Sequence, residues 1–198
     1  YYATTAYNTY VASLPCYVAQ LDEYPAQMKQ VEEQTLRKAA AGPYRWAMPD
    51  DLARLADHYG QSANFHDLET TALAAKVRVA TFENNRHSGL RVTSRARALR
   101  RTVADSTKLG RRALWHAWIE QNPLFTLQRA VQEVTQLGLA PSSIMQELAG
   151  QASRPWSQPT LRRIRARFQS SLATRLRRAS EYNPVLRMRH KLQRWQLL

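Results

Sequence analysis

Helical hydrophobic periodicity, interrupted by proline and glycine, is the feature that most constrains the fold of this chain. Between residues 65 and 82, apolar side chains recur at intervals of three and four, the spacing of one face of an α-helix. None of the six glycines forms the Asn-Gly, Asp-Gly or Gly-Gly pairs that favour two-residue hairpin turns. The sequence therefore predicts an all-α fold of about nine helices joined by short loops.

Proline, glycine and capping residues set the expected helix boundaries in the first part of the chain. We expect a helix over residues 26–41, beginning after Pro25, and another over residues 49–59. Gly60 can end the second helix in the left-handed conformation. Asn64 is the expected cap of the buried helix that follows.

The second part of the chain continues the helical pattern. Helices are expected over residues 90–108, 111–120, 123–137, 141–149 and 160–180, with a further one after 184. The 160–180 segment has one apolar stripe, made of Leu161, Ile164, Phe168, Leu172, Leu176 and Ala179. Most of its arginines fall off that stripe, so this helix is expected to be basic on its outer side.

Positive charge is concentrated in one part of the chain. The formal net charge is +14, with −3 on residues 1–85 and +17 on residues 86–198. We therefore expect an acidic-to-neutral helical part over 1–85 and a basic nucleic-acid-binding part over 86–198, without a sharp boundary. The longest apolar run, residues 10–21, is interrupted by Ser13 and Pro15, and no transmembrane segment is expected. No initiator Met or basic-plus-apolar leader is present, so the first residue is expected to be an internal cut or a processed end.

Arginine dominates the cations, with 24 Arg against five Lys, and its planar fork suits bidentate phosphate contacts. Trp156, beside Arg154 in a turn-like segment, could stack on an unpaired base. RNA or DNA backbone is thus the expected partner, without base readout. The candidate nucleic-acid-binding residues are Arg95, Arg97, Arg100, Arg101, Arg111, Arg112, Arg154, Trp156, Arg162, Arg163, Arg165, Arg167, Arg175, Arg177, Arg178, Arg187, Arg189, Lys191 and Arg194.

The concentration of arginine on these helices also allows other interpretations. An acidic protein partner, an anionic membrane surface or a solvated helix face would each accept arginines at these positions. A GC-rich genome would also replace Lys by Arg throughout the chain. Trp156 could equally anchor its own loop.

Signatures of catalysis and metal binding are missing from the sequence, so no catalytic residue, metal ligand or cofactor is expected. Asp50 and Asp51 follow Pro49, and carboxylates at a helix start are favoured by the helix dipole without any metal. His58, His66 and Asp67 would need a further aspartate to resemble a metal-hydrolase cluster, and Asp105, the available one, lies in a basic segment. Cys16 has apolar neighbours and is expected to be a buried, inert thiol.

Several segments resemble landmarks of one protein family. Residues 6–21 (AYNTYVASLPCYVAQL) resemble the stretch just after the catalytic core of LINE-type, non-LTR retrotransposon reverse transcriptases, closest to those abundant in dinoflagellates. Successive landmarks of the same region are resembled by residues 42–46, 50–52, 74–80, 109–113, 115–118, 154–157 and 181–184. Together they span nearly the whole chain.

The resemblance implies that this chain corresponds to the thumb, over residues 1–20, and to a basic helical connector after it. The family's catalytic aspartates would lie upstream of residue 1, so the resemblance gives this chain no catalytic residue of the RNA-directed DNA polymerase. The alternative is a structural accessory subunit of a large assembly such as an organellar ribosome. A nuclear location is expected for a retroelement product, and a mitochondrial or plastid one for such a subunit.

Overall fold

The computed structural model describes residues 2–20, 24–40, 47–86, 98, 99, 101, 122–150 and 158–183. Within these residues the chain forms nine α-helices and one π-helical turn, and no strand, which confirms the all-α prediction. The elements are α1 (Tyr2–Ala6), η1 (Tyr7–Val11), α2 (Ser13–Val18), α3 (Ala26–Ala39), α4 (Pro49–Leu52), α5 (Leu55–His58), α6 (Leu68–Arg86), α9 (Pro123–Gln136), α10 (Pro141–Gly150) and α11 (Gln158–Ala179).

The segment expected to be a single helix over residues 49–59 is instead two short helices, α4 and α5. The break falls at Arg54, whose φ of −126° and ψ of 20° are not helical. Arg54 is 7% exposed and donates to the backbone oxygens of Asp50 and Arg177, so its burial against α11 competes with helix continuation. The other end was predicted correctly, because Gly60 adopts a φ of 68° after α5.

The expected cap of the next helix was wrong. Helix α6 begins at Leu68, and Asp67 accepts hydrogen bonds from the Glu69 backbone N–H and from the Thr70 hydroxyl. Asn64 lies earlier, in the loop, where its Oδ1 accepts from the Ala56 backbone N–H at 2.6 Å. Both residue types are good caps, so sequence alone could not choose between them.

The later boundaries agree with the predictions. Asn122 accepts a hydrogen bond from the Leu124 backbone N–H at 3.0 Å and starts α9. Gly138, with a φ of 75°, follows the end of α9, and α10 begins at Pro141 as expected but includes Gly150, the residue expected to end it. The expected helices over 90–108, over 111–120 and after 184 lie outside the described residues, apart from 98, 99 and 101.

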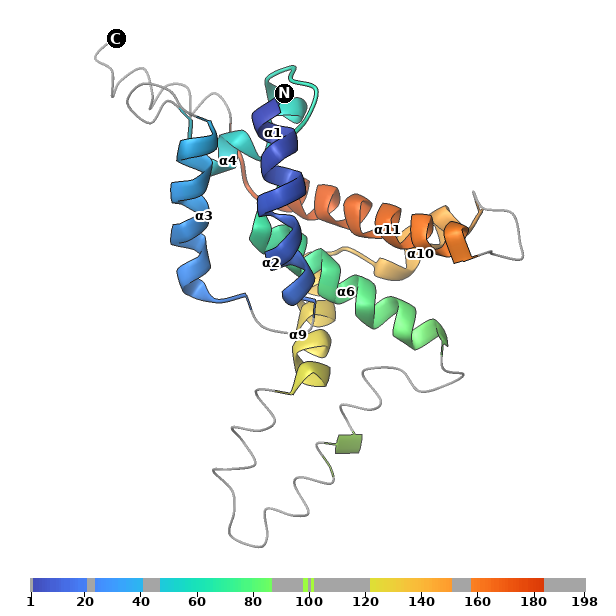
Figure 1. The fold of residues 1–198 in the computed structure, drawn as a ribbon. Coiled ribbons are helices and arrows are strands. Elements are labelled where there is room, and N and C mark those ends of the chain that lie inside the picture. Colours follow the sequence, from blue (N-terminus) through green and yellow to red (C-terminus); the bar gives the residue numbers. More distant parts are fainter. Residues whose placement is uncertain are drawn as a thin grey trace, which may run out of the picture.

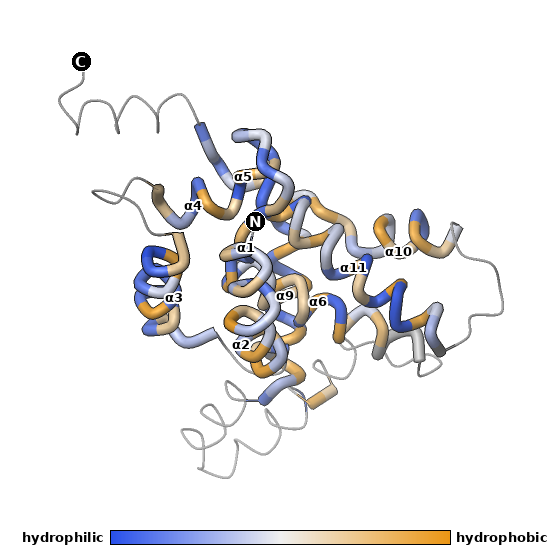
Figure 2. Tube along the Cα trace, turned by 45° about the horizontal axis from the view of Figure 1, so that its top comes forward, coloured by the Kyte–Doolittle hydropathy of each residue, from blue (hydrophilic) through white to orange (hydrophobic). Residues whose placement is uncertain are grey.

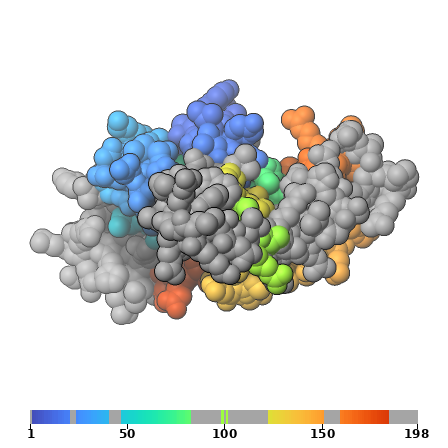
Figure 3. Space-filling view, turned by 90° about the horizontal axis from the view of Figure 1, so that it is seen from below, coloured from blue at the N-terminus to red at the C-terminus, as the bar shows by residue number. Residues whose placement is uncertain are grey.

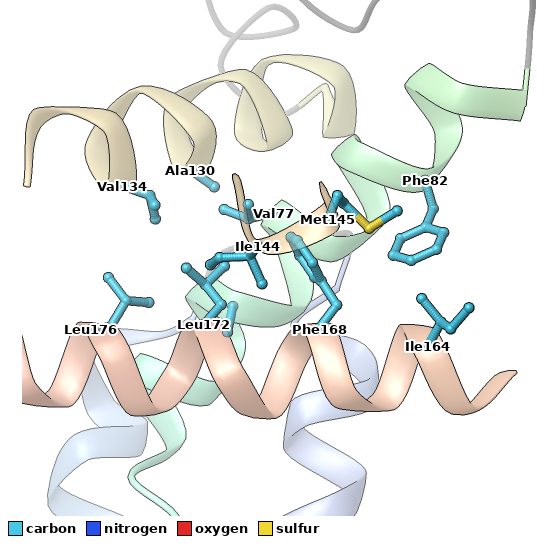
Figure 4. Packing of buried hydrophobic residues seen from close by; sticks show 11 residues of the cluster. Val77, Phe82, Ala130, Val134, Ile144, Met145, Ile164, Phe168, Leu172 and Leu176 are labelled. Carbon is cyan, nitrogen blue, oxygen red and sulfur yellow. The ribbon is translucent and has the colours of Figure 1, made fainter. Parts of the chain in front are cut away.

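The main hydrophobic core is built by α6, α9, α10 and α11. Phe168 and Leu172 of α11 are fully buried and point from the α11 backbone into the core, where Ile144 of α10 lies next to them (Figure 4). Phe82 of α6 meets Phe168 edge to face, with ring centroids 5.8 Å apart. The apolar stripe predicted over residues 160–180 therefore forms one side of this core from Leu161 to Leu176, whereas Ala179, its last predicted member, is exposed.

A second core lies at the other end of α6. It gathers Tyr7 of η1, Cys16 of α2, Leu36 of α3 and Leu68 of α6. Helix α6 thus joins the two cores and occupies the centre of the fold, with α3 on one side and α11 crossing it (Figure 1). From below, the blue α1–α3 and the yellow α9 lie at opposite edges of the molecule (Figure 3). The division of net charge at residue 85 does not coincide with a division of the hydrophobic core, because α6, from the acidic-to-neutral part, packs against α9 and α11 of the basic part.

Among the described residues, no helix combines the length and apolar character needed to cross a bilayer.

Candidate nucleic-acid interface

Helix α11 carries the basic surface that the sequence predicts. Its hydropathy alternates along the helix, with apolar residues toward the core and hydrophilic ones outside (Figure 2). Arg162, Arg163 and Arg167, in its first half, are exposed, and none forms an ion pair within the described part of the chain. Arg163 and Arg167 are four residues apart and so lie about 6 Å apart along the same side of the helix. These three guanidinium groups are available to an external anion.

The arginines in the second half of α11 have carboxylate partners within the protein. Arg175 Nη2 lies 2.7 Å from Glu147 Oε2 on α10. Arg177 and Arg178 share Asp57 of α5, at nitrogen–oxygen distances of 3.1 and 3.7 Å. The Arg177 side chain is only 15% exposed, whereas that of Arg178 is 71% exposed. Part of the predicted basic face is therefore used to hold α11 against α5 and α10.

A polar cluster fixes the end of α11 to the α4–α5 segment. The Tyr182 hydroxyl donates to Asp51 Oδ1 at 2.8 Å and lies 2.6 Å from the Tyr59 hydroxyl. The Arg54 guanidinium stacks over the Tyr182 ring, 4.5 Å from its centroid. Burial, followed by the hydrogen bonds to Tyr59 and Asp51, raises the pKa of Tyr182, which keeps its hydroxyl protonated as a donor.

The acidic pair at residues 50 and 51 has a structural role in this arrangement. Asp51 Oδ2 accepts from the Met48 backbone N–H at 2.9 Å, at the start of α4, as a helix-start interpretation predicts. The other carboxylate oxygen of Asp51 accepts the hydrogen bond from the Tyr182 hydroxyl. Within the described residues, no group of three or more His, Cys, Asp and Glu side chains is placed to hold a metal ion.

Two arginines lie on the inner side of the α6–α11 contact. The Arg165 guanidinium carbon sits 5.3 Å from the centroid of the Phe82 ring, so this predicted site residue faces α6 and not the outer surface. Arg78 of α6 donates to Gln169 Oε1 at 2.8 Å and to Gln20 Oε1 at 2.7 Å. Arg78 is not among the binding residues predicted from the sequence, because it lies in the part of the chain whose net charge is negative.

The remaining predicted site residues are placed only in part. Arg101 is exposed. Outside the described residues lie Arg95, Arg97, Arg100, Arg111, Arg112, Arg154, Trp156, Arg187, Arg189, Lys191 and Arg194.

Three residues weighed as metal ligands or as a nucleophile, His58, Asp67 and Cys16, have packing or hydrogen-bonding contacts within the fold. His58 stacks on Tyr182 with ring centroids 5.1 Å apart, and Asp67 is the hydrogen-bond acceptor at the start of α6. Cys16 is a free, buried thiol, as predicted. Burial, with smaller contributions from Glu32 and Asp67, raises its pKa to about 12, which leaves it unreactive at neutral pH.

Glu32 is a buried carboxyl group that sequence patterning did not identify. Its oxygens accept from the Tyr7 hydroxyl at 3.3 Å, the Tyr24 hydroxyl at 3.2 Å and the Leu68 backbone N–H at 2.8 Å. Burial raises the pKa of Glu32 to about 7 despite these three donors, and Asp67 adds to the rise. The group links η1, α3 and the first residue of α6.

No protein-family model matches this chain, and no curated protein or solved structure is significantly similar to it. The resemblance to retrotransposon reverse transcriptases thus remains an expectation from the sequence landmarks.

Proposed function

We propose that this chain binds the RNA or DNA backbone through the exposed arginines of α11 and carries no catalytic residue of its own. The observation that carries the proposal is the contrast within α11. Arg162, Arg163 and Arg167 are exposed without an ion pair in the described part of the chain, whereas Arg175 and Arg177 are paired internally.

Both the position and the number of the positive charges favour binding to a phosphate backbone. A phosphate that contacts an unpaired, exposed guanidinium releases counterions without breaking an internal ion pair. The +17 on residues 86–198 would raise the local concentration of a polyanion around this face. An arginine already bonded to a carboxylate contributes less, because its partner must first be displaced.

A salt titration tests the proposal. Fluorescence anisotropy with single- and double-stranded RNA and DNA should give affinities that fall steeply with salt, as expected for about five phosphate contacts. Replacing Arg162, Arg163 and Arg167 together by Gln should make the log–log slope shallower by about two to three. Salt-insensitive binding, or none, would refute the proposal.

A matched control separates location from total charge. Replacing Lys29, Arg37 and Lys38 of α3 by Gln removes the same number of positive charges from a different element, where Lys29 pairs with Glu69 and Arg37 with Glu33. We expect this variant to keep the wild-type slope. If the log–log slope became shallower by the same amount in both variants, total charge, and not the α11 surface, would control binding.

The family resemblance supports the same partner class. In a reverse transcriptase of the LINE type, a post-thumb connector would hold template RNA or target DNA while the polymerase residues act elsewhere. This interpretation predicts no preference for base sequence.

A second candidate is a structural accessory subunit of a large assembly, and a specific surface favours it. Tyr2, Tyr10, Leu14 and Tyr17 of the first three elements are 89%, 80%, 68% and 72% exposed. Exposed apolar groups gathered on neighbouring short helices are typical of surfaces that are covered in a complex. Such a subunit should self-associate or precipitate when purified alone, and replacing these four residues by Ser should restore solubility.

A further inference from the structure

Arg78 is a half-buried cation whose described partners are both neutral. It donates to the amide oxygens of Gln169 and Gln20, which occupy two of its five N–H donors. No carboxylate pairs with it in the described part of the chain. Burial lowers the pKa of Arg78, and the nearby charge of Arg165 lowers it further. Arginine nevertheless stays protonated at neutral pH, so among the described residues this charge has no carboxylate counterion.

Arg165 is in a similar position beside it. Its guanidinium stacks on the Phe82 ring, and its Nε is buried with no hydrogen-bond partner among the described residues. Buried donors are normally satisfied, and an orphaned one needs an explanation such as a bound ion. The two neighbouring guanidinium groups repel each other, and an anion placed near them would offset that repulsion.

A groove of about 260 Å³ between α6 and α11 gives access to Arg78. Gln169, Thr71, Ser170 and Thr174 line the same groove, so hydroxyl and amide groups surround the cation. Two charged groups at its other end are already engaged. Arg177 pairs with Asp57, and Asp67 accepts from Glu69 and Thr70 at the start of α6.

We propose that the groove between α6 and α11 is an anion site that takes a phosphate group, bound by Arg78 with hydroxyl groups of Ser170 and Thr174 beside it. Arg165 does not line the groove, but its charge lies near that of Arg78 and adds to the positive potential there. The phosphate can be free orthophosphate or one phosphodiester of a nucleic-acid backbone, since both present the same oxygens to a guanidinium fork. The site is distinct from the outer arginines of α11 and does not depend on the proposed function.

Thermal unfolding of the full chain tests the site, with inorganic phosphate as the probe and chloride at equal ionic strength and pH as reference. At ten times its dissociation constant, phosphate should raise the wild-type Tm by about 3–6 °C. Arg78→Gln retains a polar side chain next to Gln20 and Gln169 but should abolish that rise. Lys38→Gln, an exposed change on α3, should leave it intact.

A second variant covers the case in which Arg78→Gln does not fold. Thr174→Asp places a carboxylate in the groove without touching the bonds of Arg78, and it should also abolish the phosphate-dependent rise. No rise in the wild type, or a full rise in either folded variant, would overturn the proposal.

A short oligothymidylate distinguishes the two sources of phosphate. If a phosphodiester occupies the groove, Thr174→Asp should weaken oligonucleotide binding about tenfold as well; if free phosphate is the ligand, oligonucleotide binding should stay within about twofold of wild type. The triple Gln variant at Arg162, Arg163 and Arg167 should keep the phosphate-dependent rise. Failure of nucleic-acid binding alone therefore leaves this site standing, and failure of the phosphate response alone leaves the proposed function standing.

Discussion

Protonation of Glu32 should make this protein more stable in mild acid than in mild base. The carboxyl group has a pKa of about 7 in the folded chain, against 4.5 for an unperturbed glutamate. A raised pKa in the folded state means that ionisation is more costly there than in the unfolded chain. The stabilisation is therefore complete below pH 4.5 and is lost as pH rises toward and through 7.

The size of the effect follows from the two values. A shift of about 2.5 units corresponds to about 3 kcal/mol, of which about 2 to 3 kcal/mol falls between pH 5 and pH 8. The relevant groups around the carboxyl are Tyr7, Tyr24 and Asp67. Neither tyrosine ionises in this range, because burial and Glu32 raise the pKa of both, so their hydroxyls remain donors throughout.

Urea unfolding at several pH values measures this contribution. We compare wild type with Glu32→Gln, which keeps a carbonyl acceptor for the Leu68 N–H but cannot ionise. The free energy of unfolding of wild type, minus that of the variant, should fall by about 2 to 3 kcal/mol from pH 5 to pH 8. A difference that is constant across this range, or that increases with pH, would refute the assignment of a raised pKa to Glu32.

Three further predictions concern the framework around the basic surface, each measured as a free energy of urea unfolding. Leu172→Ala, in the fully buried stripe of α11, should cost about 3–5 kcal/mol, and a cost below 1 kcal/mol would mean that the core is not packed as described. Asn122→Ala should cost about 1 kcal/mol, because the Leu124 N–H loses its cap, whereas Asn122→Asp should retain most of the stability. Tyr182→Phe should cost about 1–3 kcal/mol, since Asp51 loses a donor, and the cost should largely disappear in an Asp51→Ala background if the two groups act as a pair.

The sequence predicted best what depends on neighbouring residues. The limits of α9 follow from an N-terminal Asn-Pro pattern and a terminal glycine, the start of α10 follows from a Pro-Ser pattern, and the core face of α11 follows from its apolar spacing. These signals act within one or two turns of a helix, so they operate regardless of what the rest of the chain does. The prediction of Cys16 as a buried thiol was right for a similar reason, because its immediate neighbours are apolar.

The errors arose where a distant residue decides the local structure. Arg54 interrupts the segment expected over 49–59 because it is buried against the carbonyl of Arg177, which is 123 residues away. The burial of Glu32 likewise requires Tyr7, from another helix, as its donor. Local patterning describes each of these residues as an ordinary charged helix position, and tertiary contacts override that preference.

The same distinction changes the meaning of the positive charge. Composition treats the arginines of α11 as equivalent, yet the fold gives them three different environments. Arg163 faces outward without a described partner, Arg177 is paired with Asp57, and Arg165 faces inward onto Phe82. An outward arginine can contribute binding energy, and a paired one stabilises the contact between α5 and α11. An inward one packs on an aromatic ring of α6 and is turned away from a ligand on the outer surface. Net charge therefore bounds the number of phosphate contacts from above, and the pairing of each guanidinium determines how many of them this surface can make.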